Sequence, residues 1–251
     1  MRYALDIAYQ GSAYAGWQRQ PNANSIQAEL EQALGTVLRT TVETTGAGRT
    51  DAGVHARCLT VHFDCEAQLQ AGILHNLNGV LPGDIAAHTL YQAVAPDFHA
   101  RFSALYRGYT YLIVPRKDPF WRDLAAVYRY PLDLDAMQTA ARMLTEYEDF
   151  ASFCKAHGAN ETTRCQLHHA YWEQREDGLL AFHIRANRFL RGMVRAIVGT
   201  MLLVGSGKLH PEAFRDVIEG EDRRFAGPNA EACGLYLTEV GYPEGMLTVL
   251  D

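Results

Sequence analysis

The chain has 251 residues, which is long enough for one large domain or two small ones with a sizeable core. Its net charge of −6 argues mildly against a nucleic-acid partner, because proteins that bind phosphate backbones usually carry a basic surface. The longest apolar stretch, 193–204, is interrupted by Arg195 and is too short to span a bilayer. The first residues alternate like a strand and lack the apolar core of a signal peptide, so we expect a cytoplasmic protein.

The first half of the chain is predicted to run strand, helix, strand, strand, helix, strand. A strand at 2–9 is followed by a polar, aromatic loop that contains Trp17, Gln18 and Arg19. A helix is expected to begin at Asn24 or Ser25, with Gln27 placed to form a capping box on Asn24. The other elements predicted in this half are a segment at 42–45, a strand from Leu59, a helix over 68–80 and a strand over 86–93.

A glycine-rich motif at 46–56 carries an arginine and an aspartate. Its glycines let the backbone turn tightly, and Arg49 and Asp51 would point to the same side of an extended segment. One interpretation is a loop without function. A phosphate-binding or dinucleotide-binding loop is disfavoured, because Gly-Lys-Ser/Thr is missing, Asp51 stands where a third glycine is needed, and a strand follows. The remaining interpretation is a turn that presents an ionised carboxylate beside a guanidinium, as a nucleophile or an orienting base requires.

The second half is predicted to repeat this order of elements. On a strand at 107–114, Tyr109 is either a core aromatic or a ring that stacks on a flipped base. A long apolar helix is expected over 188–204, with Arg188, Arg191 and Arg195 along one side. Arg195 lies in its apolar part, so we expect a carboxylate or phosphate partner for it. The other elements predicted are a helix at 133–144, strands at 167–173 and 179–185 joined by a hairpin at Asp177-Gly178, a helix at 211–219 and a strand at 235–240.

These elements predict an α+β fold. Two β/α halves, 1–104 and 105–251, would share a continuous, mostly antiparallel sheet with the helices on one side. No linker or low-complexity segment divides them.

The cysteines and the basic residues give weaker signals. Five cysteines without a Cys-x-x-Cys pair indicate reduced thiols. Zinc binding by Cys154, His157, Cys165 and His168 is not expected, because the second pair enters a strand in which residues three apart face opposite sides. Arginine makes up 20 of the 23 basic residues and binds phosphate in a bidentate fork, although a GC-rich genome would produce the same bias.

Several of these segments together resemble the TruA family of tRNA pseudouridine synthases. The resemblance covers nearly the whole chain in the right order. It is carried by Gly16-Trp17-Gln18-Arg19-Gln20, Gly48-Arg-Thr-Asp51-Ala-Gly-Val-His55-Ala, Leu81-Pro-Gly-Asp84, Asp97-Phe-His-Ala-Arg101-Phe102-Ser, Asn187 with Phe189, Met193-Val-Arg195 and Gly234-Leu-Tyr-Leu.

The resemblance implies an enzyme that isomerises uridine to pseudouridine at positions 38, 39 and 40 of the tRNA anticodon stem-loop. It implies a homodimer without cofactor or metal, built from two RRM-like halves that share a central sheet. Asp51 would be the catalytic carboxylate, Arg49 and Arg195 would hold it, and Tyr109 would stack on the target base. The C5 proton needs a base, for which Tyr109 and water are the candidates.

The same resemblance implies a set of tRNA contacts and leaves two rival functions open. His55 is expected to support the motif loop, and Trp17 either touches RNA or packs against the motif. An RNA-binding module without the chemistry and a phosphate-ligand enzyme are the alternatives, both disfavoured by the residues present. The expected tRNA contacts are Trp17, Gln18, Arg19, Arg101, Arg107, Arg188 and Arg191.

Overall fold

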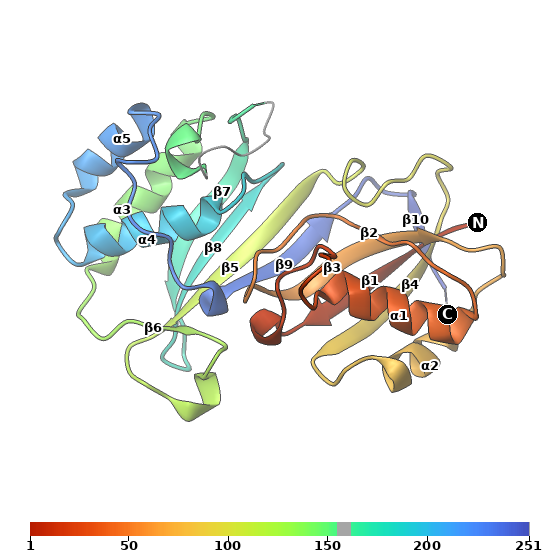
Figure 1. Ribbon diagram of the computed structural model, residues 1–251. Coiled ribbons are helices and arrows are strands. Elements are labelled where there is room, and N and C mark those ends of the chain that lie inside the picture. The colour runs from red at the N-terminus through yellow and green to blue at the C-terminus, as the bar shows by residue number, and fades with distance from the viewer. Residues whose placement is uncertain (155–161, 251) are drawn as a thin grey trace. The chain divides into compact units, whose positions relative to one another are not determined.

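A computed structural model describes residues 1–154 and 162–250 (Figure 1). Its contacts divide the chain into two compact units, one formed by Met1–Leu105 with the C-terminal segment from Tyr236, the other by Tyr106–Leu235. The predicted class is confirmed, since the described residues form an α+β protein whose strands pair mostly antiparallel.

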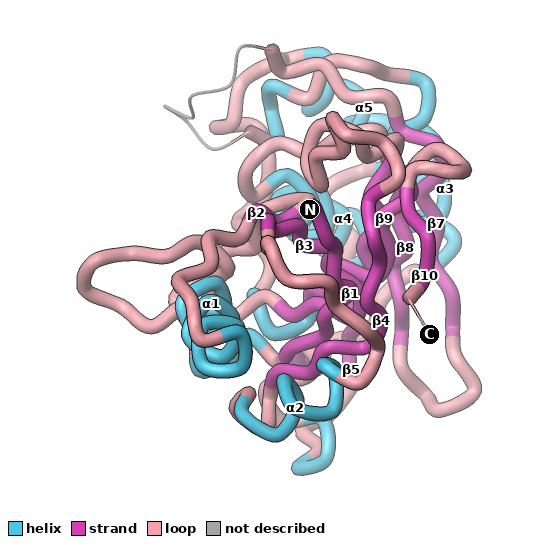
Figure 2. Tube along the Cα trace, turned by 90° about the vertical axis from the view of Figure 1, so that its right-hand side faces the viewer, coloured by secondary structure: helices cyan, strands magenta, loops and turns pink. Residues whose placement is uncertain are grey.

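The first unit is an RRM-like arrangement of strands and helices. Its strands follow the order β10-β4-β1-β3-β9, and β2 also pairs with β3. All pairs are antiparallel except β3 with β9. Figure 2 shows α1 and α2 on the same side of these strands. The elements are β1 (Arg2–Tyr9), α1 (Ile26–Leu38), β2 (Thr45–Gly46), β3 (His55–Asp64), α2 (Ile73–Val80), β4 (Ile85–Ala93), β9 (Leu235–Gly241) and β10 (Leu247–Val249).

The described part of the second unit contains three long strands and three α-helices. Its strands follow the order β5-β8-β7 with antiparallel pairing, and the short β6 pairs with β5 in parallel. The apolar residues of α4 are buried, as are Trp172 and Phe182 of the sheet. The elements are β5 (Tyr106–Val114), β6 (Ala126–Val127), α3 (Leu134–Met143), β7 (Leu167–Gln174), β8 (Leu180–Ala186), α4 (Met193–Gly205) and α5 (Pro211–Glu219).

The division into units differs from the expected halves at the C-terminus. The first boundary lies between Leu105 and Tyr106, one residue after the 104/105 boundary of the expected halves, and the segment from Tyr236 groups with the first unit. The reason is strand pairing, because β9 bonds to β3 and β10 bonds to β4.

Two helix starts were predicted wrongly, since the helix expected over 68–80 begins at Ile73 and the helix expected from 188 also begins later. The helix expected from 188 begins at Met193, because Gly192 adopts a left-handed φ of 73° that interrupts the helical path. Arg188 and Arg191 therefore precede α4 and do not lie along its side. The start of α1 at Ser25 is confirmed, although its capping box is not. Ser25 is the N-cap and accepts from the backbone N–H of Ala28, while Gln27 forms no capping box.

Candidate active site

The motif loop connects β2 to β3 and holds Asp51 at a defined backbone position. At its start the N–H of Ala47 donates to the carbonyl of Thr60 at 2.8 Å. At its end the N–H of Val54 donates to the carbonyl of Asp51 at 3.1 Å, which closes a tight turn in which Gly53 has a φ of 78°. Asp51 is half-buried at the first position of that turn, four residues before β3 begins.

Thr50, directly before Asp51, is anchored from two sides. Its hydroxyl is 2.8 Å from the hydroxyl of Tyr9, and its carbonyl accepts from the N–H of Trp17 at 3.1 Å. Gly16 lies so close that a Cβ there would come within 2.5 Å of this carbonyl oxygen. The backbone that carries Asp51 is thus fixed against both β1 and the 16–20 loop.

Trp17 packs under the motif loop. It is 3% exposed, and its ring lies where a Cβ on Gly46 would approach it to 2.9 Å. Of the two roles left open for Trp17, this is the packing role. Gln18 and Arg19, next to it, are exposed.

His55 supports the other end of the loop. Its side chain is fully buried, its Nδ1 accepts from the N–H of Gly11 at 3.1 Å, and its ring stacks on Tyr236 at 4.6 Å. Because Nδ1 is an acceptor, the neutral ring carries its proton on Nε2. Tyr236 lies on β9, so this contact connects the end of the motif loop to that strand.

Arg49 lies on the same loop with its side chain exposed. The ion pairs among the described residues do not include Arg49. The guanidinium–carboxylate contact expected between Arg49 and Asp51 is therefore not among these ion pairs.

In the second unit, Tyr109 and Arg107 share one face of β5 and are held by the segment after β8. Tyr109 is half-buried and packs edge-on against Phe189, with ring centroids 5.1 Å apart and an interplanar angle of 89°. Arg107 donates from Nη1 to the carbonyl of Asn187 at 3.0 Å. Asn187 and Phe189 were noticed only as part of the family pattern, and no periodicity in the sequence could have revealed these contacts.

Arg195 lies on the first turn of α4 and is half-buried. Its Nε donates to the carbonyl of Ala230 at 2.7 Å, and the N–H of Ala230 donates back to the carbonyl of Arg195 at 2.9 Å. The partner of Arg195 in the structure is thus a neutral carbonyl where a carboxylate or phosphate was expected. This contact fixes the guanidinium without neutralising its charge.

Comparisons with known proteins match the chain to one family. A family model described as tRNA pseudouridine synthase matches residues 7–103 and 140–243. The tRNA pseudouridine synthase A of Bacteroides thetaiotaomicron is 49% identical over 254 residues, covering 98% of this chain and 93% of that protein. The enzyme of the same name from Parabacteroides distasonis is 45% identical, covering 100% of this chain and 99% of that protein, and that of Chromobacterium violaceum is 41% identical. The chain belongs to the TruA family of tRNA pseudouridine synthases.

As a TruA-family enzyme, the protein is an isomerase that converts uridine in tRNA to pseudouridine. The mild argument from net charge against a nucleic-acid partner was therefore wrong. The net charge of a chain does not tell how its charged side chains are distributed over the surface. The expected tRNA contacts Arg19, Arg101 and Arg191 are all exposed.

No group of metal-binding side chains occurs among the described residues, and His157 of the possible zinc set lies outside them. Burial raises the pKa of the Cys165 thiol to about 11, which disfavours the thiolate that zinc requires. Within the described part of the TruA-family chain, no helix is long and apolar enough to cross a membrane.

Proposed function

We propose that this enzyme isomerises uridines 38, 39 and 40 of the tRNA anticodon stem-loop with Asp51 as its catalytic carboxylate. The observation that carries the proposal is the bonded loop around Asp51, fixed at Thr50 by Trp17 and at its turn by Val54. Such fixation keeps a reactive group in a productive geometry.

The reaction needs no net oxidation and no added group, because uridine and pseudouridine are isomers. The N1–C1′ bond breaks, the base rotates, C5 bonds to C1′, the C5 proton leaves to a base or solvent, and N1 gains a proton. Asp51 starts this by attacking C1′ or C6, or by promoting loss of the 2′ proton to give a glycal. These three routes share the requirement for an ionised carboxylate.

The remaining candidate residues are assigned by the chemistry each side chain supports. We propose that Arg49 and Arg195 orient the Asp51 carboxylate by their positive charge. Tyr109 offers a ring on which a flipped uridine stacks in place of its lost neighbours, at an unstacking cost of about a few kcal/mol. Phosphates of the stem are bound by Arg19, Arg101, Arg107, Arg188 and Arg191, with Gln18 as a neutral contact.

Two properties of the whole enzyme belong to the same proposal. We propose a homodimer in which one tRNA contacts both subunits, acting in the cytoplasm. Sedimentation of the enzyme with and without tRNA tests the dimer, and a monomer that retains full activity contradicts it.

Release of tritium from tRNA labelled at uridine C5 tests the activity and its positions. Three transcripts, each with its only labelled uridine at 38, 39 or 40, should each release tritium, and a transcript labelled only in the acceptor stem should not. Binding of tRNA without release from any transcript would instead support an RNA-binding module.

A further inference from the structure

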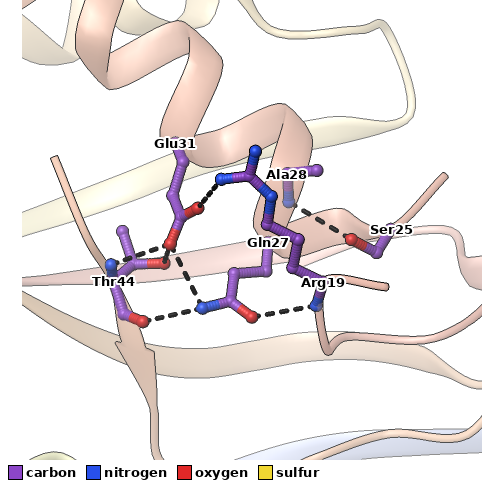
Figure 3. Close-up of polar contacts among 6 residues, drawn as sticks. All are labelled: Arg19, Ser25, Gln27, Ala28, Glu31 and Thr44. Atoms are coloured by element: carbon purple, nitrogen blue, oxygen red, sulfur yellow. Dashed lines mark hydrogen bonds and ion pairs between the residues drawn. The ribbon is translucent and has the colours of Figure 1, made fainter. Parts of the chain in front are cut away.

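Two polar side chains on the first turns of α1 connect the segments on either side of the motif loop. Gln27 and Glu31 are four residues apart and therefore lie on the same side of the helix. Figure 3 shows both between Arg19 on one flank and Thr44 on the other. The side chain of Glu31 is only 10% exposed, although it is charged.

The carboxylate of Glu31 is bonded on both oxygens. Oε1 accepts from the N–H of Thr44 at 2.9 Å, from its hydroxyl at 3.1 Å and from Nε2 of Gln27 at 3.1 Å. Oε2 accepts from Nη1 of Arg19 at 3.2 Å. Four donors, one of them charged, offset the cost of holding this carboxylate away from water.

The amide of Gln27 is bonded to the same two segments. Nε2 donates to the carbonyl of Thr44 at 2.8 Å, and Oε1 accepts from the N–H of Arg19 at 3.0 Å. The backbone N–H of Gln27 also donates to the carbonyl of Trp17 at 3.0 Å. One residue therefore bridges the 17–19 segment and Thr44.

Both bridged segments lead directly to Asp51. Thr44 precedes β2, which runs into the motif loop. Trp17 donates to the carbonyl of Thr50, the residue before Asp51. A displacement of either segment is thus passed along the backbone to the carboxylate.

We propose that Gln27 and Glu31 are positioning residues that hold the motif loop in the geometry at which Asp51 reacts. This inference rests on the proposed role of Asp51. Both act through the backbone, since their side-chain hydrogen bonds go to Arg19, Thr44 and each other. Removing their bonds should lower the rate of the chemical step by about tenfold to a hundredfold, because small misplacements of a reacting group cost about that much.

The chain offers variants that separate this role from simple stability. Gln27→Leu removes the three side-chain hydrogen bonds of Gln27, to Arg19, Thr44 and Glu31, at similar volume. Glu31→Leu removes all four contacts, whereas Glu31→Gln can keep its oxygen at the Oε1 position and loses only the ion pair with Arg19. Asn78→Leu is the matched control, because the side chain of Asn78 on α2 also bonds the backbone of a strand. It donates to the carbonyl of Ala87 and accepts from the N–H of Ala87, both at 2.8 Å.

The test is single-turnover tritium release at saturating tRNA, with tRNA Kd measured alongside. Gln27→Leu and Glu31→Leu should slow release about tenfold to a hundredfold with Kd within about twofold. Glu31→Gln should recover most of the rate, and Asn78→Leu should release tritium as the wild type does. Rates for Gln27→Leu and Asn78→Leu that agree within twofold, or a loss confined to Kd, would overturn the inference. A wild-type enzyme that releases no tritium would instead overturn the proposed function.

Discussion

At the scale of single residues, the roles of the Tyr109 ring and of its hydroxyl can be tested separately. Tyr109→Phe keeps the stacking surface and the edge contact with Phe189, so KM for tRNA should stay unchanged. The kcat of this variant reports whether the hydroxyl removes the C5 proton. Tyr109→Leu loses the stacking surface, worth about 1–3 kcal/mol, and should raise KM about fivefold or more.

The control for this pair is Tyr171→Leu. Tyr171 also lies on a strand of the second unit and stacks on a neighbouring ring, His183, at 4.9 Å. It has no proposed role in RNA binding, so its substitution should leave KM as it is. If Tyr109→Leu and Tyr171→Leu have equal KM for tRNA, Tyr109 does not stack on the target base.

His62 makes stability depend on pH. Burial, together with the neighbouring His99 and Arg2, lowers the pKa of His62 to about 4, and its Nδ1 accepts from the N–H of Ala100 at 3.1 Å. The unfolded chain, with a histidine pKa of about 6.5, binds a proton over pH 4–6.5 that the folded state does not bind. Stability from His62 is therefore complete above about pH 6.5 and falls as the pH drops toward 4, by on the order of 2 kcal/mol.

Urea unfolding at several pH values checks this expectation. Between pH 6.5 and 4.5, the free energy of unfolding should fall more steeply for the wild type than for His62→Gln, which cannot take up this proton. Parallel curves for the two proteins would show that His62 titrates alike in the folded and unfolded states.

At the scale of elements, the 97–103 turn presents a cation and an aromatic ring on the surface. Phe102 is 75% exposed, and Arg101 has its Cζ 5.4 Å from that ring. Nδ1 of His99 accepts from the N–H groups of both residues, at 3.2 and 3.3 Å, which fixes the turn. Such a pair suits contact with a phosphate and an adjacent base.

Arg101→Ala should weaken tRNA binding and reduce the slope of log K against log salt by about 1, because one phosphate contact is lost. The matched control is Arg142→Ala, an exposed arginine on α3. If both variants keep the wild-type slope, Arg101 does not contact phosphate. The measurement is filter binding over a series of salt concentrations.

The sequence predicted elements best where a periodic pattern and a clear terminator coincided. The strand at 2–9 and the helix at 211–219 are confirmed to the residue, and the Asp177-Gly178 turn joins β7 to β8 as expected. The segment expected at 42–45 is a strand only at its end, in β2 at Thr45–Gly46. The short strands β6 and β10 were missed because two or three residues carry no usable period. The start of α4 was missed because the left-handed Gly192 follows residues that would suit a helix.

The candidate site was less predictable than the fold. Asp51 and its turn could be found from the motif, but the contacts of Gln27, Glu31 and Phe189 could not. These side chains contact residues that are distant in the sequence. Their spacing in the sequence indicates only that they lie on a helix surface or near a strand. The neutral partner of Arg195 was missed for a related reason, because a carbonyl acceptor leaves no sign in the sequence.

At the scale of the whole molecule, the proposed catalytic residues come from both compact units. Arg49 and Asp51 belong to the first, and Tyr109 and Arg195 belong to the second. The family match also covers parts of both, at 7–103 and 140–243. The substitutions above are therefore best made in the full chain.

The most direct test of the account is tritium release by Asp51→Asn with tRNA binding measured in parallel. Asn keeps the size of the side chain but cannot ionise, so release should fall to background while tRNA Kd stays within a few-fold of wild type. Asp177→Asn, in the exposed hairpin turn of the second unit, should release tritium at the wild-type rate. Release by Asp51→Asn at a rate near that of Asp177→Asn would contradict the central claim that Asp51 is the catalytic carboxylate.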